Sequence, residues 1–159
     1  MPRFVIQHHQ ATALHYDFRL EVDGVLRSWA VPKGLSTDPA VKRLAVEVGD
    51  HALEHAEFEG PAGRGGVIIW DEGDYRNLDE ERSMDAALRD GHAKVWLEGR
   101  KLRGGWTLQR TDTGDRPQWL VIKRRDGEAD AARDVTADEP ASVRSGRTLR
   151  DVVAEARHT

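Results

Sequence analysis

Residues 14–22 alternate strictly between apolar and polar side chains, which is the pattern of a half-buried β-strand. Because successive side chains of a strand point to opposite faces, one face is expected to pack into a core while the other stays polar. The expected core face carries Leu14, Tyr16, Phe18, Leu20 and Val22, and the polar face carries His15, Asp17, Arg19 and Glu21. The polar face is therefore either simply solvated or the location of a functional site.

A functional site on this face would suit metal-assisted phosphate chemistry. His15 and Asp17 stand two residues apart on the same side of the strand, so an imidazole and a carboxylate can bind one divalent cation. Arg19 is the next residue on that face, and its guanidinium can hold an anion that the cation also contacts.

A third metal ligand is available from the preceding segment. Residues 4–9 predict a short strand, and a turn through residues 10–12 would fold His9 back beside the His15 and Asp17 pair. His8 and His9 cannot both face the ligand set from an extended segment, and His9 is preferred because it shares the parity of His15. Three ligands leave open positions for water or substrate, as in catalytic metal sites.

The segments that follow predict a hairpin and a third strand. Asp23-Gly24 is a strong signal for a type I′ turn, so residues 25–31 are expected to return antiparallel to residues 14–22. In the next predicted strand, residues 42–48, Arg43 shares a face with Glu47 and is a second candidate for holding an anion. Lys33, in the loop between them, either contacts a phosphate or is solvated.

His51 and His55 form a further pair. If Asp50 caps a short helix, the two imidazoles stand at positions i and i+4 on one helical face. This spacing fits a rival or extended metal site, and a histidine near neutrality also suits proton transfer. Two surface histidines on a helical turn are the alternative interpretation.

The rest of the chain predicts a mainly β fold. A tight loop is expected over residues 60–66, a buried strand over 67–70 and a short helix over 83–89 with Ser83 as its cap. Further strands are expected over 92–97, 103–110 and 118–124. Repeated short strands joined by turns favour a small antiparallel β-barrel, closed or nearly closed, with a few short flanking helices.

The domain organisation follows from length and composition. We expect one barrel domain over residues 1–125 and a tail over 126–159, because 159 residues suit a single domain. Residues 126–139 contain few large apolar side chains and are expected to form a flexible linker. A C-terminal helix is expected over residues 148–157.

Charge, cysteine content and hydropathy exclude several classes of protein. The net charge of −4 argues against a protein that coats nucleic acid, although residues 81–125 hold eleven basic and six acidic side chains. The absence of cysteine excludes disulfides, thiolate nucleophiles and cysteine-bound zinc. Without a signal peptide or an apolar run of about 18 residues, the expected location is the cytoplasm, with no membrane partner.

Several motifs resemble the 3′-phosphoesterase domain of bacterial and archaeal DNA ligase D. The resemblance begins with Gln7-His8-His9 and is most specific in the uninterrupted block over residues 14–34. Shorter matches continue it in order, over residues 42–46, 50–54, 58–60, 69–71, 99–102, 105–106 and 119–123. It covers residues 3 to about 125.

This resemblance implies a Mn²⁺-dependent enzyme that trims the 3′ ends of DNA, or of DNA tipped with RNA, before ligation. Such domains remove a terminal ribonucleoside as a phosphodiesterase and the remaining 3′-phosphate as a phosphomonoesterase. The resemblance implies that the metal is bound by His9, His15 and Asp17, and the scissile phosphate by Arg19 and Arg43, with His51 positioning the phosphate or protonating the leaving oxygen.

The chain departs from the family pattern at three places. His55 stands where the family usually has tyrosine and would replace its hydroxyl as a donor or add a metal ligand. Gly49 stands where the family has an acidic residue. The loop after Glu59-Gly60 is shorter than usual and lacks a Gly-Tyr-Gly-like stretch.

Two other functions compete with this interpretation. A non-catalytic module would recognise DNA ends or phosphate and dock to a DNA ligase, a polymerase or an end-binding protein. Alternatively, two histidines and one carboxylate on a small barrel would form the facial triad of a non-haem iron oxygenase. The pair of arginines favours phosphate over the oxygenase.

Overall fold

The sequence-predicted strand over residues 14–22 forms as expected and is β2 (Leu14–Val22). In the computed structural model, which describes residues 1–156, it pairs antiparallel with both β1 (Arg3–Gln10) and β3 (Val25–Val31). The turn from β2 to β3 has positive φ at Asp23 (50°) and Gly24 (85°), as a type I′ turn requires.

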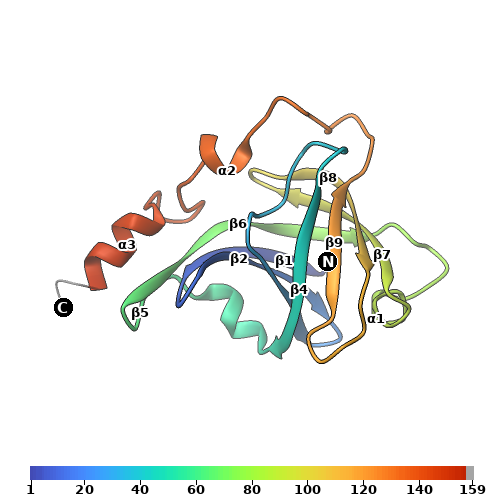
Figure 1. Ribbon diagram of the computed structural model, residues 1–159, viewed down its shortest axis with the longest axis horizontal. Helices are drawn as coiled ribbons and strands as arrows, with labels where there is room; N and C mark the ends of the chain where they lie inside the picture. The colour runs from blue at the N-terminus through green and yellow to red at the C-terminus, as the bar shows by residue number, and fades with distance from the viewer. Residues whose placement is uncertain (157–159) are drawn as a thin grey trace.

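The strands close into an eight-stranded antiparallel barrel, as predicted (Figure 1). The order around the barrel is β1, β2, β3, β4, β9, β8, β7 and β6, and pairing of β6 with β1 completes the circle. The later strands are β4 (Lys42–His51), β6 (Gly65–Asn77), β7 (His92–Gly99), β8 (Arg103–Arg110) and β9 (Gln118–Lys123). The short strand β5 (Gly60–Ala62) pairs with β6 outside this circle. Residues 60–66 are therefore mostly a β-hairpin, where a loop was expected.

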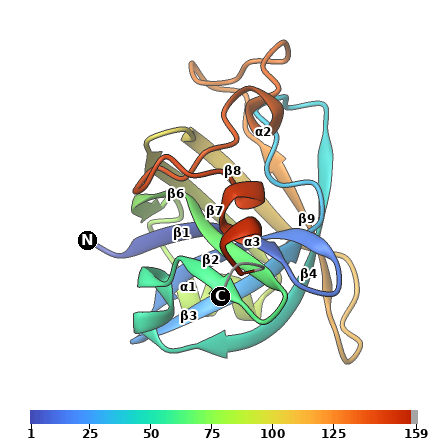
Figure 2. The same ribbon diagram turned by 90° about the vertical axis from the view of Figure 1, so that its left-hand side faces the viewer.

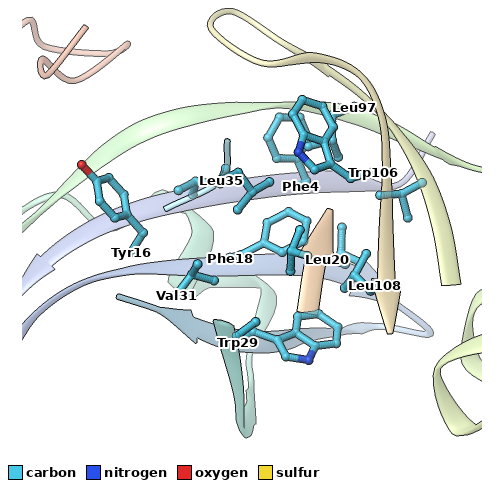
Figure 3. Packing of buried hydrophobic residues seen from close by; sticks show 14 of the residues in the cluster. Phe4, Tyr16, Phe18, Leu20, Trp29, Val31, Leu35, Leu97, Trp106 and Leu108 are labelled. Carbon is cyan, nitrogen blue, oxygen red and sulfur yellow. The ribbon is translucent and has the colours of Figure 1, made fainter. Parts of the chain in front are cut away.

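The expected apolar face of β2 points into the barrel interior. Phe18 and Leu20 are completely buried, and Figure 3 shows them among Trp29 of β3 and Trp106 and Leu108 of β8. Fully burying such a side chain contributes about 1.5–3 kcal/mol. The alternation that predicted the strand therefore also predicts its core residues. The exception on this face is Leu14, which is 51% exposed at the start of β2.

In strand β4 a small residue, and not a large apolar one, points into the barrel. Ala45 is fully buried in the core, whereas Leu44, on the other face, is 43% exposed. Arg43 shares the inward parity of Ala45 and pairs with the core residue Val121 of β9. The larger apolar side chains of β4 therefore lie on the outer face of the barrel.

The helices are short, as expected. They are the 3₁₀-helix η1 (Leu53–Glu57), α1 (Met84–Arg89), α2 (Val135–Asp138) and α3 (Leu149–Ala156). The Ser83 hydroxyl accepts a hydrogen bond from Ala86 N and caps α1, as predicted. Asp50 caps no helix, because β4 continues through His51 and η1 starts only after Ala52. None of the helices described here is long and apolar enough to cross a membrane.

The segment after the barrel packs against it, where a flexible linker was expected over residues 126–139. Val135 is 2% exposed and belongs to the core, and Lys101 Nζ donates to the carbonyls of Glu139 and Ala141. Hydrogen bonds to backbone groups thus hold a segment whose composition offers little to bury. Further on, α3 lies against β6 and β5 (Figure 2). Its predicted end at Arg157 lies outside the described residues.

Candidate metal centre

Two neighbouring strands bring together the predicted metal ligands on the outer face of the barrel. His9 of β1 lies directly opposite His15 of β2, and Gln7 lies opposite Asp17. Because cross-strand neighbours point to the same face, His9, His15 and Asp17 converge. One donor atom from each lies within 4.8 Å of the other two.

The donor atoms fit a small divalent cation. Asp17 Oδ2 lies 3.3 Å from His9 Nδ1, and Asp17 Oδ1 lies 3.2 Å from His15 Nε2. A cation bound at about 2.1 Å places neighbouring ligand atoms roughly 3 Å apart. In addition, His15 Nδ1 lies 3.2 Å from the Ala13 carbonyl. A proton on Nδ1 donated to that carbonyl leaves Nε2 free to bind a metal.

The protonation of Asp17 also suits a metal ligand. Burial by itself would raise the pKa of this carboxyl, but hydrogen bonds from His15 and His9 and the charge of Arg19 hold it well below its usual range. Asp17 is therefore a carboxylate at neutral pH. The hydrogen bond to Asp17 in turn raises the pKa of His15 against the effect of burial.

Arg19 is held rigidly beside the ligands. It is 3% exposed, and its Nη2 lies 3.2 Å from Asp17 Oδ2. Its Nε donates to Gln7 Oε1 and its Nη1 to Ser28 Oγ, both at 2.8 Å. These three contacts fix the plane of the guanidinium. Arg19 therefore presents a positive charge in one orientation at the edge of the candidate metal site.

Gln7 is a site residue that sequence reasoning missed. It is 1% exposed, and while its Oε1 accepts from Arg19, its Nε2 donates to the carbonyls of His55 (2.8 Å) and Phe58 (3.1 Å). Gln7 thus links Arg19 to η1. Its position in the sequence could have indicated this role. Gln7 lies two residues before His9, so both side chains point to the same face of β1 and toward the ligands.

His51 and His55 lie together although the helix expected to carry both does not form. His51 ends β4, His55 belongs to η1, and their rings stack with centroids 4.5 Å apart. Burial and the nearby charge of Arg19 lower the pKa of both, so both imidazoles are neutral at neutral pH. His8 instead stacks on Tyr16, with ring centroids 4.0 Å apart, on the other face of β1. This placement agrees with the choice of His9 as the ligand.

A comparison with known protein families identifies the family of this chain. The family model described as the DNA ligase D 3′-phosphoesterase domain matches residues 7–110. The chain belongs to the DNA ligase D 3′-phosphoesterase family. The match contains each residue proposed above for the metal or the phosphate, from His9 to His55.

Curated relatives of this phosphoesterase family support the assignment. The chain is 50% identical over 155 residues to the multifunctional non-homologous end joining protein LigD of Pseudomonas aeruginosa, covering 92% of this chain and 18% of that protein. It is 50% identical over 123 residues to the corresponding protein of Mycobacterium tuberculosis, covering 74% and 15%. For Mycolicibacterium smegmatis the identity is 40% over 134 residues, covering 78% and 17%. The chain thus spans less than a fifth of the length of these relatives.

Arg43 and Lys33, the two other cations considered for the phosphate, line a pocket that includes none of the metal ligands. Arg43 has the inward parity on β4, opposite to the outward face of Asp17, and its buried Nε has no hydrogen-bond partner among the described residues. Arg43 lines a pocket of about 340 Å³ together with Lys33, Pro32 and Val41. The suggested role of Arg43 in holding phosphate therefore stays a prediction.

Proposed function

We propose that this chain is a metal-dependent phosphoesterase that processes the 3′ ends of DNA. The observation that carries the proposal is the convergence of two imidazoles and one carboxylate beside the buried guanidinium of Arg19. A cation ligand set next to a fixed cationic donor suits a substrate whose oxygens contact both, and a phosphate ester has such oxygens. Membership of the phosphoesterase family agrees with that substrate class.

Each group has a proposed role in phosphate ester hydrolysis. His9, His15 and Asp17 would hold Mn²⁺ or another divalent cation, which supplies Lewis acidity toward a phosphoryl oxygen or a bound water. Arg19 would neutralise charge that builds up on the phosphoryl oxygens in the transition state.

The stacked histidines have a second role. As neutral imidazoles, His51 and His55 would each donate an N–H hydrogen bond to the phosphate, or His55 would add a metal ligand. A role of His51 as the acid toward the leaving oxygen would require its imidazolium form, which would return to the neutral imidazole as the oxygen takes the proton. Arg43 is proposed as a further phosphate contact, acting from the pocket that it lines with Lys33 and not from the face of the metal ligands.

The biological setting is also a proposal. The curated relatives are named for non-homologous end joining, so we propose that this chain prepares 3′ ends for ligation in that process. A DNA ligase, a polymerase or an end-binding protein would be the partner, and the cytoplasm the compartment. The two proposed reactions are removal of a 3′-terminal ribonucleoside and removal of a 3′-phosphate.

The test is incubation of the purified chain and Mn²⁺ with two labelled primer-templates. One primer ends in a 3′-phosphate and the other in a single ribonucleotide. We expect loss of the 3′-phosphate, and shortening of the second primer followed by loss of the phosphate left behind. Asp17→Asn is the matched inactive control because it preserves side-chain size while removing the charge of the ligand.

The outcomes separate the alternatives. Reaction with the 3′-phosphate alone would restrict the function to phosphomonoester hydrolysis. If neither primer reacts although Mn²⁺ binds, a role in binding DNA ends without catalysis would replace the proposal. Oxidation of an organic substrate with Fe²⁺ and an oxo-acid would instead indicate the oxygenase.

A further inference from the structure

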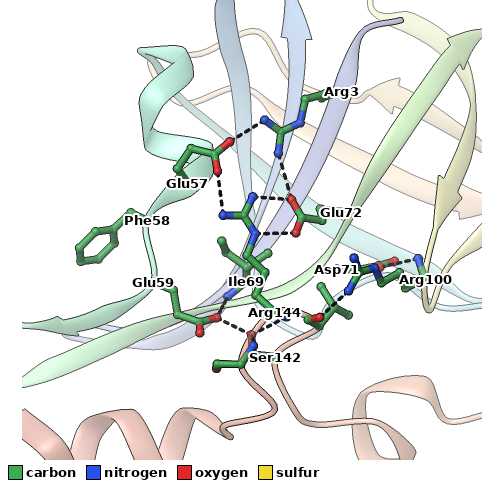
Figure 4. A network of polar contacts seen from close by, with 12 residues as sticks. Arg3, Glu57, Phe58, Glu59, Ile69, Asp71, Glu72, Arg100, Ser142 and Arg144 are labelled. Carbon is green, nitrogen blue, oxygen red and sulfur yellow. Dashed lines mark hydrogen bonds and ion pairs between the residues drawn. The ribbon is translucent and has the colours of Figure 1, made fainter.

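A ring of four charged side chains connects the carboxyl-terminal segment to the helix that carries His55 (Figure 4). Arg144 makes a two-pronged contact with Glu72, Nε to Oε2 at 2.6 Å and Nη2 to Oε1 at 2.8 Å, and its Nη1 lies 2.7 Å from Glu57 Oε2. Arg3 closes the ring with contacts of 2.6 Å to Glu57 and 3.0 Å to Glu72. Glu57 is the last residue of η1.

This ring differs from an isolated surface ion pair. Exposed single pairs contribute little because two flexible side chains must be ordered for one contact. Here each of the four side chains has two partners, the contact between Arg144 and Glu72 is bidentate, and the side chain of Glu72 is only 13% exposed. The ring therefore fixes Glu57 from two sides.

A second set of contacts holds the chain just after η1. Ser142 Oγ donates to Glu59 Oε1 at 2.5 Å, and Arg147 Nη2 lies 3.3 Å from Glu59 Oε2. Val143 N donates to the carbonyl of Ile69 in β6 at 3.0 Å. We call residues 142–147 the brace, because they join the end of η1 to the barrel wall.

The brace also has an apolar side. Val143 packs against a small buried cluster on the outer face of the barrel. The cluster consists of Val5, Leu26, Ala56 and Ile69. Ala56 is the neighbour of His55 in η1 and is 3% exposed. The brace thus covers the buried side of η1, while the His55 ring stacks on His51.

We infer that the brace positions His55 for the reaction, with Arg144 acting through Glu57 to hold η1 in place. The direct link from the site strands to this helix is the side chain of Gln7, which donates to the carbonyls of His55 and Phe58. The ring around Glu57 and the contacts to Glu59 further restrain the position of η1 relative to the barrel. This inference rests on the proposed function, because it assigns His55 to the phosphate.

The inference is tested first without turnover, by the ring resonances of the histidines in NMR spectra of Arg144→Ala. We expect the His55 and His51 signals to shift and broaden, while the His15 signal stays in place because its strand does not depend on the brace. The matched control is Arg103→Ala, which removes a single ion pair of 2.9 Å to Glu98. An unmoved His55 signal in Arg144→Ala would overturn the inference.

The second test uses the 3′-phosphate primer. We expect Arg144→Ala to lower kcat by roughly 10- to 100-fold, as small misplacements of a reacting group do, with the Mn²⁺ affinity unchanged. In a His55→Ala background the same substitution should cause no further loss. Arg144→Lys should restore part of the rate, because lysine keeps the charge but not the two-pronged contact.

If Arg144→Ala lowered kcat equally in the wild type and in the His55→Ala background, Arg144 could not act by positioning His55. If the wild-type chain hydrolyses neither primer, the proposed function fails separately and the NMR result alone decides. Shifted His51 and His55 signals would then still support positioning of η1 by the brace, and unshifted signals would overturn it.

Discussion

Nη2 of Arg19 lies 3.2 Å from Oδ2 of Asp17, and both side chains are more than nine-tenths buried. The arginine is therefore the counter-ion of a proposed metal ligand as well as a proposed contact for the phosphate. When no cation is bound, the positive charge of Arg19 is the nearest compensation for the carboxylate besides the histidines.

This relationship predicts a stability cost for Arg19→Ala. Removing one partner of a buried ion pair leaves the other charge uncompensated and typically costs about 3–5 kcal/mol. We expect a loss of this order in the free energy of unfolding, measured by urea denaturation without metal. Since added Mn²⁺ would compensate Asp17, it should restore part of the loss. A variant as stable as the wild type would show that Asp17 is neutral or solvated.

Metal binding should depend on His9 and not on its neighbour. We expect His9→Ala to weaken Mn²⁺ binding by more than about 100-fold, since even indirect supports of a metal site cost 10- to 100-fold. His8→Ala is the matched control, because that imidazole lies on the other face of β1. Calorimetric titration measures both, and equal effects of the two substitutions would contradict the proposed ligand set.

Arg43 should influence turnover and not the metal. Its inward parity on β4 keeps it away from the ligand atoms, so Arg43→Ala is expected to leave the Mn²⁺ affinity unchanged. If Arg43 holds the phosphate, the rate on the 3′-phosphate primer should fall at least tenfold, by analogy with the loss of one charge-stabilising donor. Steady-state kinetics decide the point, and an unchanged rate would remove Arg43 from the site.

The ring of charged side chains around Glu57 predicts how the stability of the protein depends on pH in the acid range. Contacts with Arg144 and Arg3 lower the pKa of Glu57 to about 2, from an ordinary value near 4.5. A carboxyl with a lowered pKa contributes its full stability above pH 4.5 and loses it as the pH falls toward 2. The stability difference between wild type and Glu57→Gln should therefore be constant above pH 4.5 and shrink below it. Urea denaturation across pH 3–7 measures this, and a difference independent of pH would contradict it.

Local pattern was enough to predict β2, its turn and the convergence of the ligands. The alternation of residues 14–22 has a period of two, and a type I′ turn leaves one register for β3, so the faces follow from the sequence. The pairing of His9 with His15 needed only one further short turn.

Long-range contacts explain what could not be predicted. The stacking of His51 on His55 depends on an irregularity in the pairing of β3 with β4 and on a 3₁₀-helix that Gln7 anchors from another strand. The segment over residues 126–139 is polar, and its attachment depends on donors such as Lys101, 38 residues away from Glu139. Composition does not encode such partners.

The circular order of the strands has a consequence for how the proposed metal site would bind an ion. β1 is hydrogen-bonded to β2 on one side and to β6 on the other, so the strand that carries His9 is in place before any cation arrives. A site built in advance needs no folding energy from its metal, and chelation should empty it without unfolding the barrel. Two imidazoles and one carboxylate also accept several first-row divalent ions. The proposed site would therefore bind whichever of these ions the cell supplies, and we expect a change in that supply to alter the rate of the proposed reaction while the barrel stays folded.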